Sequence, residues 1–254
     1  MIAMWFNVEE KRVFAGGSQG EAAEVVLIHG AGGDHSVWDG VLGGVGAAVA
    51  FDLPGHGCSD GPALASIAAL ADWLALAFDA AGIKTAAVAG HSMGALVALE
   101  FAARHPARVR ALALLGAAAA MPVHGDLLVA ARDDPPTAAA MIAGWGFARE
   151  GADPALVEQT RLRLEASAPG VLHAGLAACA AYAGGMSAAA RVQCPTVVVI
   201  GSQDRMSPPK AGVALAESIL GAASVVLEGA GHMMMMDQPG PVAAALIEAG
   251  LFAR

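Results

Sequence analysis

The stretch Ala86-Ala-Val-Ala-Gly-His-Ser-Met-Gly-Ala-Leu-Val-Ala-Leu99 decides the fold. Its first four residues, Ala86–Ala89, form an apolar run with the length of a buried strand. Helix-forming residues begin at Met93 and continue to Arg104. The pentapeptide between them, Gly90–Gly94, has the pattern G-x-S-x-G. The sequence therefore predicts a strand, a sharp turn that carries a serine, and a helix.

The two glycines of this motif have a physical reason. A serine on a sharp strand-to-helix turn has a strained backbone, and residues two positions away crowd the turn, so glycine fits there. We expect the turn to present the hydroxyl of Ser92 above a sheet as a nucleophile. The N–H of Met93 then lies at a helix N-terminus, where negative charge is stabilised. His91 is expected to point below the turn.

Strand and helix patterns alternate along most of the chain, which predicts a parallel sheet with helices on both faces, the α/β class. Two weak strands near the N-terminus predict an antiparallel hairpin at the sheet edge. The predicted strands are Met4–Val8, Arg12–Ala15, Glu24–His29, Val45–Phe51, Thr85–Ala89, Val109–Leu115, Pro195–Gly201 and Ser224–Leu227. Outside the serine motif, the predicted helices of this α/β part are Ser36–Leu42, Ile67–Ala81, Pro209–Leu220 and Pro239–Ala253.

The alternation stops at Gly116, and residues 117–190 contain helical patterns without a convincing strand. We therefore expect an all-helical insertion (117–190) between two parts of one α/β core, 1–116 and 191–254. Its predicted helices, separated by proline-containing stretches, are Leu127–Arg132, Thr137–Trp145, Pro154–Ala168 and Val171–Ala183.

Composition limits the class of protein. Of the 254 residues, 56% are hydrophobic and 15% charged, so a large core is available and disorder is disfavoured. The net charge of −9 argues against a nucleic-acid or anionic-membrane partner. Cys58, Cys179 and Cys194 lack metal-ligand spacing and are expected to be free thiols in a reducing compartment. With no signal peptide pattern and no apolar run of membrane-spanning length, we expect a soluble cytoplasmic protein.

Chemically active residues follow three of the predicted strands. Ser92 follows one, Asp204 lies just after the strand that ends at Gly201, and His232 follows the last strand. Reacting groups gather at the carboxyl ends of parallel strands, and the order Ser, Asp, His is the one expected of an α/β-hydrolase. Asp60, Asp126 and Asp237 are alternatives for the acid. Some α/β-hydrolases place the acid directly after the strand that follows the serine turn, but Gly116–Ala119 offers no carboxylate there, which favours Asp204.

At these residues the chain resembles the α/β-hydrolase superfamily, specifically the capped serine hydrolases of the haloperoxidase-like, enol-lactonase and esterase kind. The matching segments are His29–Gly32, Asp52–Ser59, Gly90–Gly94, Cys194-Pro195 with Gly201 and Asp204, and Gly231-His232. The resemblance implies an α/β-hydrolase fold, mostly parallel, with the helical insertion as a cap over Ser92. The sequence shows no metal-ligand pattern and no glycine-rich phosphate loop, so we expect no cofactor.

Acyl-transfer chemistry assigns the roles. His232 would take the Ser92 proton and pass it to the leaving group, while Asp204 orients the imidazole. The oxyanion needs two donors, and the turn that carries Ser92 supplies the N–H of Met93. The resemblance places the second at the N–H of Ala31, with Gly32 as the alternative. His29 is expected to be a hydrogen-bonded structural residue, and His56 to orient its loop.

The pocket is less clearly encoded. Gly32, Trp145 and Met233 are candidate substrate-binding residues, with Phe147, Tyr182 and further methionines in an apolar lining. Arg132, Arg149, Arg161 and Arg163 could hold a substrate carboxylate, although arginines on helices are more typical of a solvated face.

Three hypotheses follow for function. The leading one is a serine hydrolase that cleaves a small, largely apolar ester or lactone through an acyl-enzyme. Carbon–carbon bond hydrolysis, haloperoxidase or lyase chemistry on the same triad is the alternative, because one fold hosts many reactions. A binding protein that reuses the fold for ligand capture is the third. The expected partner is in each case a small molecule.

Overall fold

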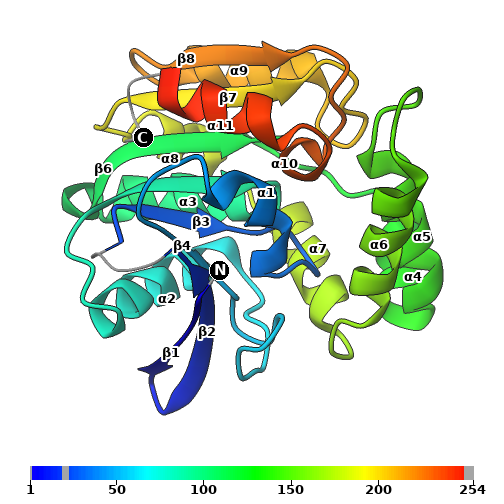
Figure 1. Ribbon diagram of the computed structural model, residues 1–254, viewed down its shortest axis with the longest axis horizontal. Helices are drawn as coiled ribbons and strands as arrows, with labels where there is room; N and C mark the ends of the chain where they lie inside the picture. The colour runs from blue at the N-terminus through cyan, green and yellow to red at the C-terminus, as the bar shows by residue number, and fades with distance from the viewer. Residues whose placement is uncertain (1, 19–22, 249–254) are drawn as a thin grey trace.

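The computed structural model describes residues 2–18 and 23–248, and in these ranges one eight-stranded sheet forms the centre of the molecule (Figure 1). Its order is β1-β2-β4-β3-β5-β6-β7-β8, and β1 and β2 form the predicted antiparallel edge hairpin. β2 also runs antiparallel to β4, and all further pairs are parallel. The predicted α/β fold with a mostly parallel sheet is confirmed. The strands are β1 (Ile2–Val8), β2 (Lys11–Gly17), β3 (Val25–Ile28), β4 (Ala48–Phe51), β5 (Ala86–His91), β6 (Val109–Leu115), β7 (Thr196–Gly201) and β8 (Ala223–Leu227).

Helices cover both faces of the sheet, because strand residues alternate between two apolar clusters. In β3, for example, Val26 and Ile28 belong to one cluster, and Val25 and Leu27 to the other. On the first face pack α2 (Ile67–Ala80), α3 (Met93–Arg104), α8 (Gly185–Ala189) and α9 (Pro209–Ser218). On the second pack α1 (Asp39–Leu42), the short α10 (Met234–Asp237) and α11 (Pro239–Glu248).

The helical insertion leaves the sheet after β6 and returns at β7 (Figure 1). Asp134 and Asp153 cap two of its helices, and a proline follows each cap at the first helical position, where its missing N–H costs nothing. α4, α5, α6 and α7 share a third apolar cluster, which includes Leu127, Ile142 and Leu164. The four helices are α4 (Gly125–Asp133), α5 (Pro135–Gly146), α6 (Pro154–Glu165) and α7 (Val171–Ala181).

Some boundaries differ from the sequence-based expectation. β5 continues to His91 instead of ending at Ala89, since Gly90 and His91 still pair with β6. α8 was not predicted, and it packs against α3 and α9. The last predicted helix extends to Ala253, but residues 249–254 lie outside the described residues. No helix in the described ranges is both long and apolar enough to cross a bilayer.

Candidate active site

Ser92 occupies the turn between β5 and α3, with φ 55° and ψ −119°. This positive φ is uncommon for a residue with a Cβ, and it marks the strained backbone that the motif predicts. A Cβ on Gly90 would overlap the carbonyl of Gly94. A Cβ on Gly94 would overlap the carbonyls of Ile28 and His29, so both glycines of the motif are required by close backbone contacts.

The two predicted oxyanion donors come from adjoining backbone segments. Met93 is the first residue of α3, and its N–H therefore has no acceptor within the helix. Ala31 lies in the loop after β3, where a Cβ on Gly30 would be 3.2 Å from Ser92 Cβ. Ala31 and the Met93 side chain both meet α7 at Gly175, whose added Cβ would lie 2.8 Å from Ala31 Cβ and 3.0 Å from Met93 Sδ.

The predicted acid and base form a hydrogen-bonded pair. His232 Nδ1 lies 2.8 Å from Asp204 Oδ2, and both side chains are buried. Asp204 Oδ1 accepts the backbone N–H groups of Met206 and Ser207 at 2.9 and 2.8 Å. Because the carboxylate can only accept, Nδ1 of His232 carries the hydrogen and Nε2 of the neutral ring is left as an acceptor. A Cβ on Gly116 would be 3.0 Å from His232 Nδ1, so this position leaves room for the pair.

Ser92 and His232 line the same two adjoining cavities. The α6 cavity, with about 580 Å³ of empty space partly open to solvent, lies against α6. The α4 cavity, with about 660 Å³, lies against α4 and the end of α5. No hydrogen bond joins the Ser92 hydroxyl to His232 in the described part of the chain, an arrangement common before substrate closes a site.

The other predicted pocket residues divide between these cavities. Gly32 and Met233 line the α6 cavity, and Trp145 lines the α4 cavity. Phe147 and Tyr182, expected along the lining, line neither. Phe147 is packed away from solvent, and the Tyr182 hydroxyl donates to a buried carboxylate on α3.

The position of His91 differs from the expected one below the turn. Its ring lies beside that of His232, with 4.7 Å between the ring centroids, and it contributes to the wall of the α6 cavity. His91 Nε2 lies 3.0 Å from the backbone carbonyl of His232 and donates to it. Burial, followed by the charge of His232, holds the pKa of His91 well below its ordinary value. His91 is therefore a neutral donor that fixes the backbone of the residue predicted to be the base.

Two further histidines stabilise the loops, as the sequence predicts. His29 Nδ1 donates to the carbonyl of Gly30 at 2.8 Å, and its Nε2 accepts the N–H of Leu53 at 3.0 Å. His56 Nδ1 donates to the carbonyl of Pro54 at 3.0 Å. Burial lowers the pKa of His29, and it lowers the pKa of His56 to about 3. Both rings are neutral at ordinary pH.

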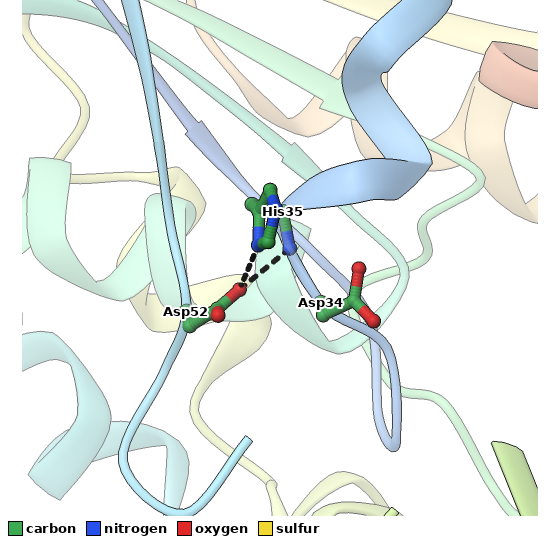
Figure 2. A group of neighbouring side chains, drawn as sticks. All are labelled: Asp34, His35 and Asp52. Atoms are coloured by element: carbon green, nitrogen blue, oxygen red, sulfur yellow. Dashed lines mark hydrogen bonds and ion pairs between the residues drawn. The ribbon is translucent and has the colours of Figure 1, made fainter. Parts of the chain in front are cut away.

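Figure 2 shows Asp34, His35 and Asp52, a group in the described residues that could offer three metal ligands within 4.8 Å of one another. Hydrogen bonds already occupy these atoms. Asp52 Oδ1 accepts from the His35 backbone N–H at 2.7 Å and from Nδ1 at 2.8 Å, and Asp34 Oδ1 accepts the Ser36 N–H. Burial lowers the pKa of His35, but the hydrogen bond and charge of Asp52 outweigh it and raise the pKa overall. Through these hydrogen bonds the group orders two loops.

The helical insertion is tied to the loops that carry the predicted acid and base. Met233, next to His232, donates its backbone N–H to the carbonyl of Gly146 at 2.8 Å. Arg205, next to Asp204, donates to the carbonyl of Phe147 at 3.3 Å. These contacts hold the C-terminal end of α5 beside the two loops that carry Asp204 and His232.

Comparisons with known proteins agree with this architecture. A model described as the alpha/beta hydrolase family matches residues 25–245. The chain is 32% identical over 253 residues to a pimeloyl-[acyl-carrier protein] methyl ester esterase of Neisseria meningitidis, covering 90% of this chain and 94% of that protein. A solved thermophilic esterase superposes with a TM-score of 0.85 at 26% identity over 99% of both chains. The enol-lactonase of Burkholderia xenovorans LB400 has the same fold, with a TM-score of 0.90 at 23% identity over 97% of this chain and 99% of that one.

Proposed function

Because the chain belongs to the α/β hydrolase family, we propose that it hydrolyses a small, largely apolar carboxylic ester or lactone through an acyl-enzyme on Ser92. One observation carries the proposal: His232, which is hydrogen-bonded to Asp204 at 2.8 Å, lines the same cavity as Ser92. The similarity to a methyl ester esterase and to a thermophilic esterase supports an ester as the bond that is cleaved.

The proposed reaction has two halves. His232 Nε2 takes the proton of Ser92 Oγ as this oxygen attacks the carbonyl carbon, and the N–H groups of Met93 and Ala31 stabilise the oxyanion. The tetrahedral intermediate then expels the alkoxide, which receives the proton from His232. Water attacks the acyl-enzyme by the same route and releases the acid. Asp204 stabilises the imidazolium in each half.

The two cavities support a division of the substrate. They meet at Ser92 and His232, so the acyl group and the alcohol group of one ester can lie on opposite sides of the serine. Both linings are mainly apolar, which favours a substrate without many polar groups. The helical insertion supplies the outer walls and acts as a cap that excludes water. The three unpaired cysteines support a reducing compartment such as the cytoplasm.

Ser92→Ala tests the proposal. We expect kcat on p-nitrophenyl butyrate to fall by about 10⁴-fold or more, as for other serine hydrolases that lose their nucleophile. The matched control is Ser187→Ala, an exposed serine of α8, which should retain the wild-type rate. A fluorophosphonate probe should label Ser92, as located by peptide mass spectrometry. Equal rates in wild type and Ser92→Ala, with no label at Ser92, would refute the proposal.

A further inference from the structure

The structure separates the four arginines of the helical insertion. Arg132 and Arg161 form ion pairs with neighbouring carboxylates on exposed helix faces. Arg149 is exposed. Arg163, on α6, instead lines the α6 cavity together with Ser92.

Arg163 has an unusual environment for a charged side chain. Its Nη1 is buried and has no hydrogen-bond partner, and no ion pair to Arg163 exists within the described residues. Asp34 lines the same cavity, but its carboxylate accepts from Ser36 at 2.8 Å. A buried donor without an acceptor is rare in folded proteins and asks for an explanation. A ligand in the cavity would supply the missing acceptor.

Thr160 adds a second donor on the same helix face, three residues before Arg163. Its side chain is buried, and its hydroxyl reaches the thioether sulfur of Met236 at 3.8 Å. Thioether sulfur is a weak acceptor, so this hydroxyl can turn to a stronger one. The lining around the two donors is apolar, with Leu164 and Leu176 among it. The cavity therefore has a polar corner on α6, in addition to the polar groups around Ser92 and Asp34.

The position of Arg163 tells which part of a substrate it would meet. Arg163 also lines a surface groove with Asp39 and Gln159, a groove that Ser92 does not line. Arg163 thus contributes to the walls of both the α6 cavity and this groove, whereas Ser92 contributes to the α6 cavity and not to the groove. A group bound there belongs to the far end of the substrate.

We propose that Arg163 and Thr160 bind a carboxylate at the end of the substrate remote from the bond that Ser92 attacks. The proposal rests on the proposed esterase function and names its substrate class, the half-esters of dicarboxylic acids. Among the described residues that line the cavity, Arg163 is the one arginine or lysine, and Asp34 already brings a negative charge. One cation matches a singly charged carboxylate better than a doubly charged phosphate.

Substrate pairs of equal chain length test this assignment. We compare monomethyl and dimethyl esters of dicarboxylic acids with four to eight carbons at pH 8, where the free carboxyl is ionised. Wild type should prefer the half-ester in kcat/KM. Arg163→Met should reduce the ratio of half-ester to diester roughly 10- to 100-fold, the range expected when a charge-assisted hydrogen bond is lost. Arg163→Lys and Thr160→Val should reduce it less. Arg161→Met, two residues away on α6, should retain the wild-type ratio.

Direct binding keeps the inference distinct from the esterase proposal. Isothermal titration calorimetry with the free dicarboxylates should give at least 10-fold weaker binding to Arg163→Met than to wild type, each variant first checked for an unchanged melting temperature. If wild type cleaves none of the esters but this difference persists, the esterase proposal fails and the carboxylate site stands. An unchanged ratio in Arg163→Met and Arg163→Gln, or no binding of any dicarboxylate to wild type, overturns the carboxylate site.

Discussion

The two halves of the candidate site differ in how their polar groups are held. In the half supplied by the α/β core, the predicted acid and a structural histidine have fixed partners: Asp204 accepts three N–H groups, and both ring nitrogens of His29 are hydrogen-bonded. In the half supplied by the helical insertion, Thr160 reaches a thioether and Arg163 Nη1 has no partner.

This difference separates chemistry from recognition. Proton transfer needs groups held in one geometry before substrate arrives, and the hydrogen bond to Asp204 holds the His232 ring in this way. Leaving a buried donor unpaired costs about 1 to 3 kcal/mol, and a ligand that supplies the acceptor removes that cost. Changes in the core half should therefore affect every substrate alike, and changes in the insertion should affect some substrates more than others.

The largest expected effect is that of Asp204→Asn. The new amide oxygen can still accept the N–H groups of Met206 and Ser207, so the fold should persist. The amide nitrogen would then face His232 Nδ1 and favour the wrong tautomer. We expect kcat to fall about 10⁴-fold for all esters, as in serine proteases with this change.

Steady-state kinetics on several p-nitrophenyl esters measure this effect. Asp237→Asn, the same change in α10, is the control and should lower kcat less than about 3-fold. If the loss of kcat in Asp204→Asn varied tenfold or more between substrates, it would contradict the expectation that changes in the core half affect every substrate alike.

The core half could be predicted from the sequence because backbone contacts dictate its residues. Gly90 and Gly94 are required by carbonyl groups that leave no space for a Cβ, so the motif reveals the turn. The positions of Asp204 and His232 follow from strand ends, which apolar runs mark clearly. Even so, the periodicity did not reveal that β5 continues to His91, because Gly90 reads as a strand end.

The insertion half could not be predicted in this way. Arg161 and Arg163 are the same residue type on one helix, two positions apart, and neither composition nor period distinguishes them. The two arginines differ in their surroundings in the folded structure: Glu158 and Glu165 lie beside Arg161, and the α6 cavity lies beside Arg163. We expected Tyr182 in the cavity lining because of its aromatic ring, but its hydroxyl instead donates a hydrogen bond to the buried carboxylate of Glu100.

The second prediction concerns stability below neutral pH. Burial lowers the pKa values of His29, His56 and His91, and it lowers that of His56 to about 3. Between about pH 3 and 6.5 the His56 ring is therefore neutral in the folded chain and protonated in the unfolded one. The free energy of unfolding must then fall as the pH falls through this window. His56 contributes roughly 1 kcal/mol per pH unit within this window.

Urea denaturation between pH 7.5 and 4.5 measures this slope. His56→Phe removes one titrating ring and should flatten the slope by about one histidine's share. His124→Asn, at an exposed helix cap, should leave it unchanged. An identical slope in wild type and His56→Phe would show that the buried ring does not govern acid stability.

The third prediction tests the insertion half. Trp145 lines the α4 cavity, and its ring lies edge-on to His124 with 6.4 Å between centroids. Trp145→Ala should enlarge this cavity and change the relative kcat/KM of small and bulky esters about 10- to 30-fold, the range for a reshaped apolar pocket. The measurement is a series of p-nitrophenyl esters from acetate to decanoate, together with butyrate esters of alcohols of increasing size.

Trp5→Ala, on the edge strand β1, is the matched control and should not alter the preference. Equal losses for all esters in Trp145→Ala would place Trp145 with the core half and contradict a role in recognition.

The smallest expected effect lies where the two halves are joined. Tyr182 follows α7, and its hydroxyl donates to Glu100 Oε2 on α3 at 2.7 Å. Because Glu100 is 6% exposed, Tyr182→Phe removes a donor from a buried carboxylate, and we expect the free energy of unfolding to fall by about 1 kcal/mol. Tyr182 lines neither cavity, so ester preference should not change.

A double-mutant cycle with Glu100→Gln isolates the pair, and the two losses should not be additive. Additive losses, or an altered preference in Tyr182→Phe, would mean that this contact transmits the state of the insertion to the site and that the two halves are not independent.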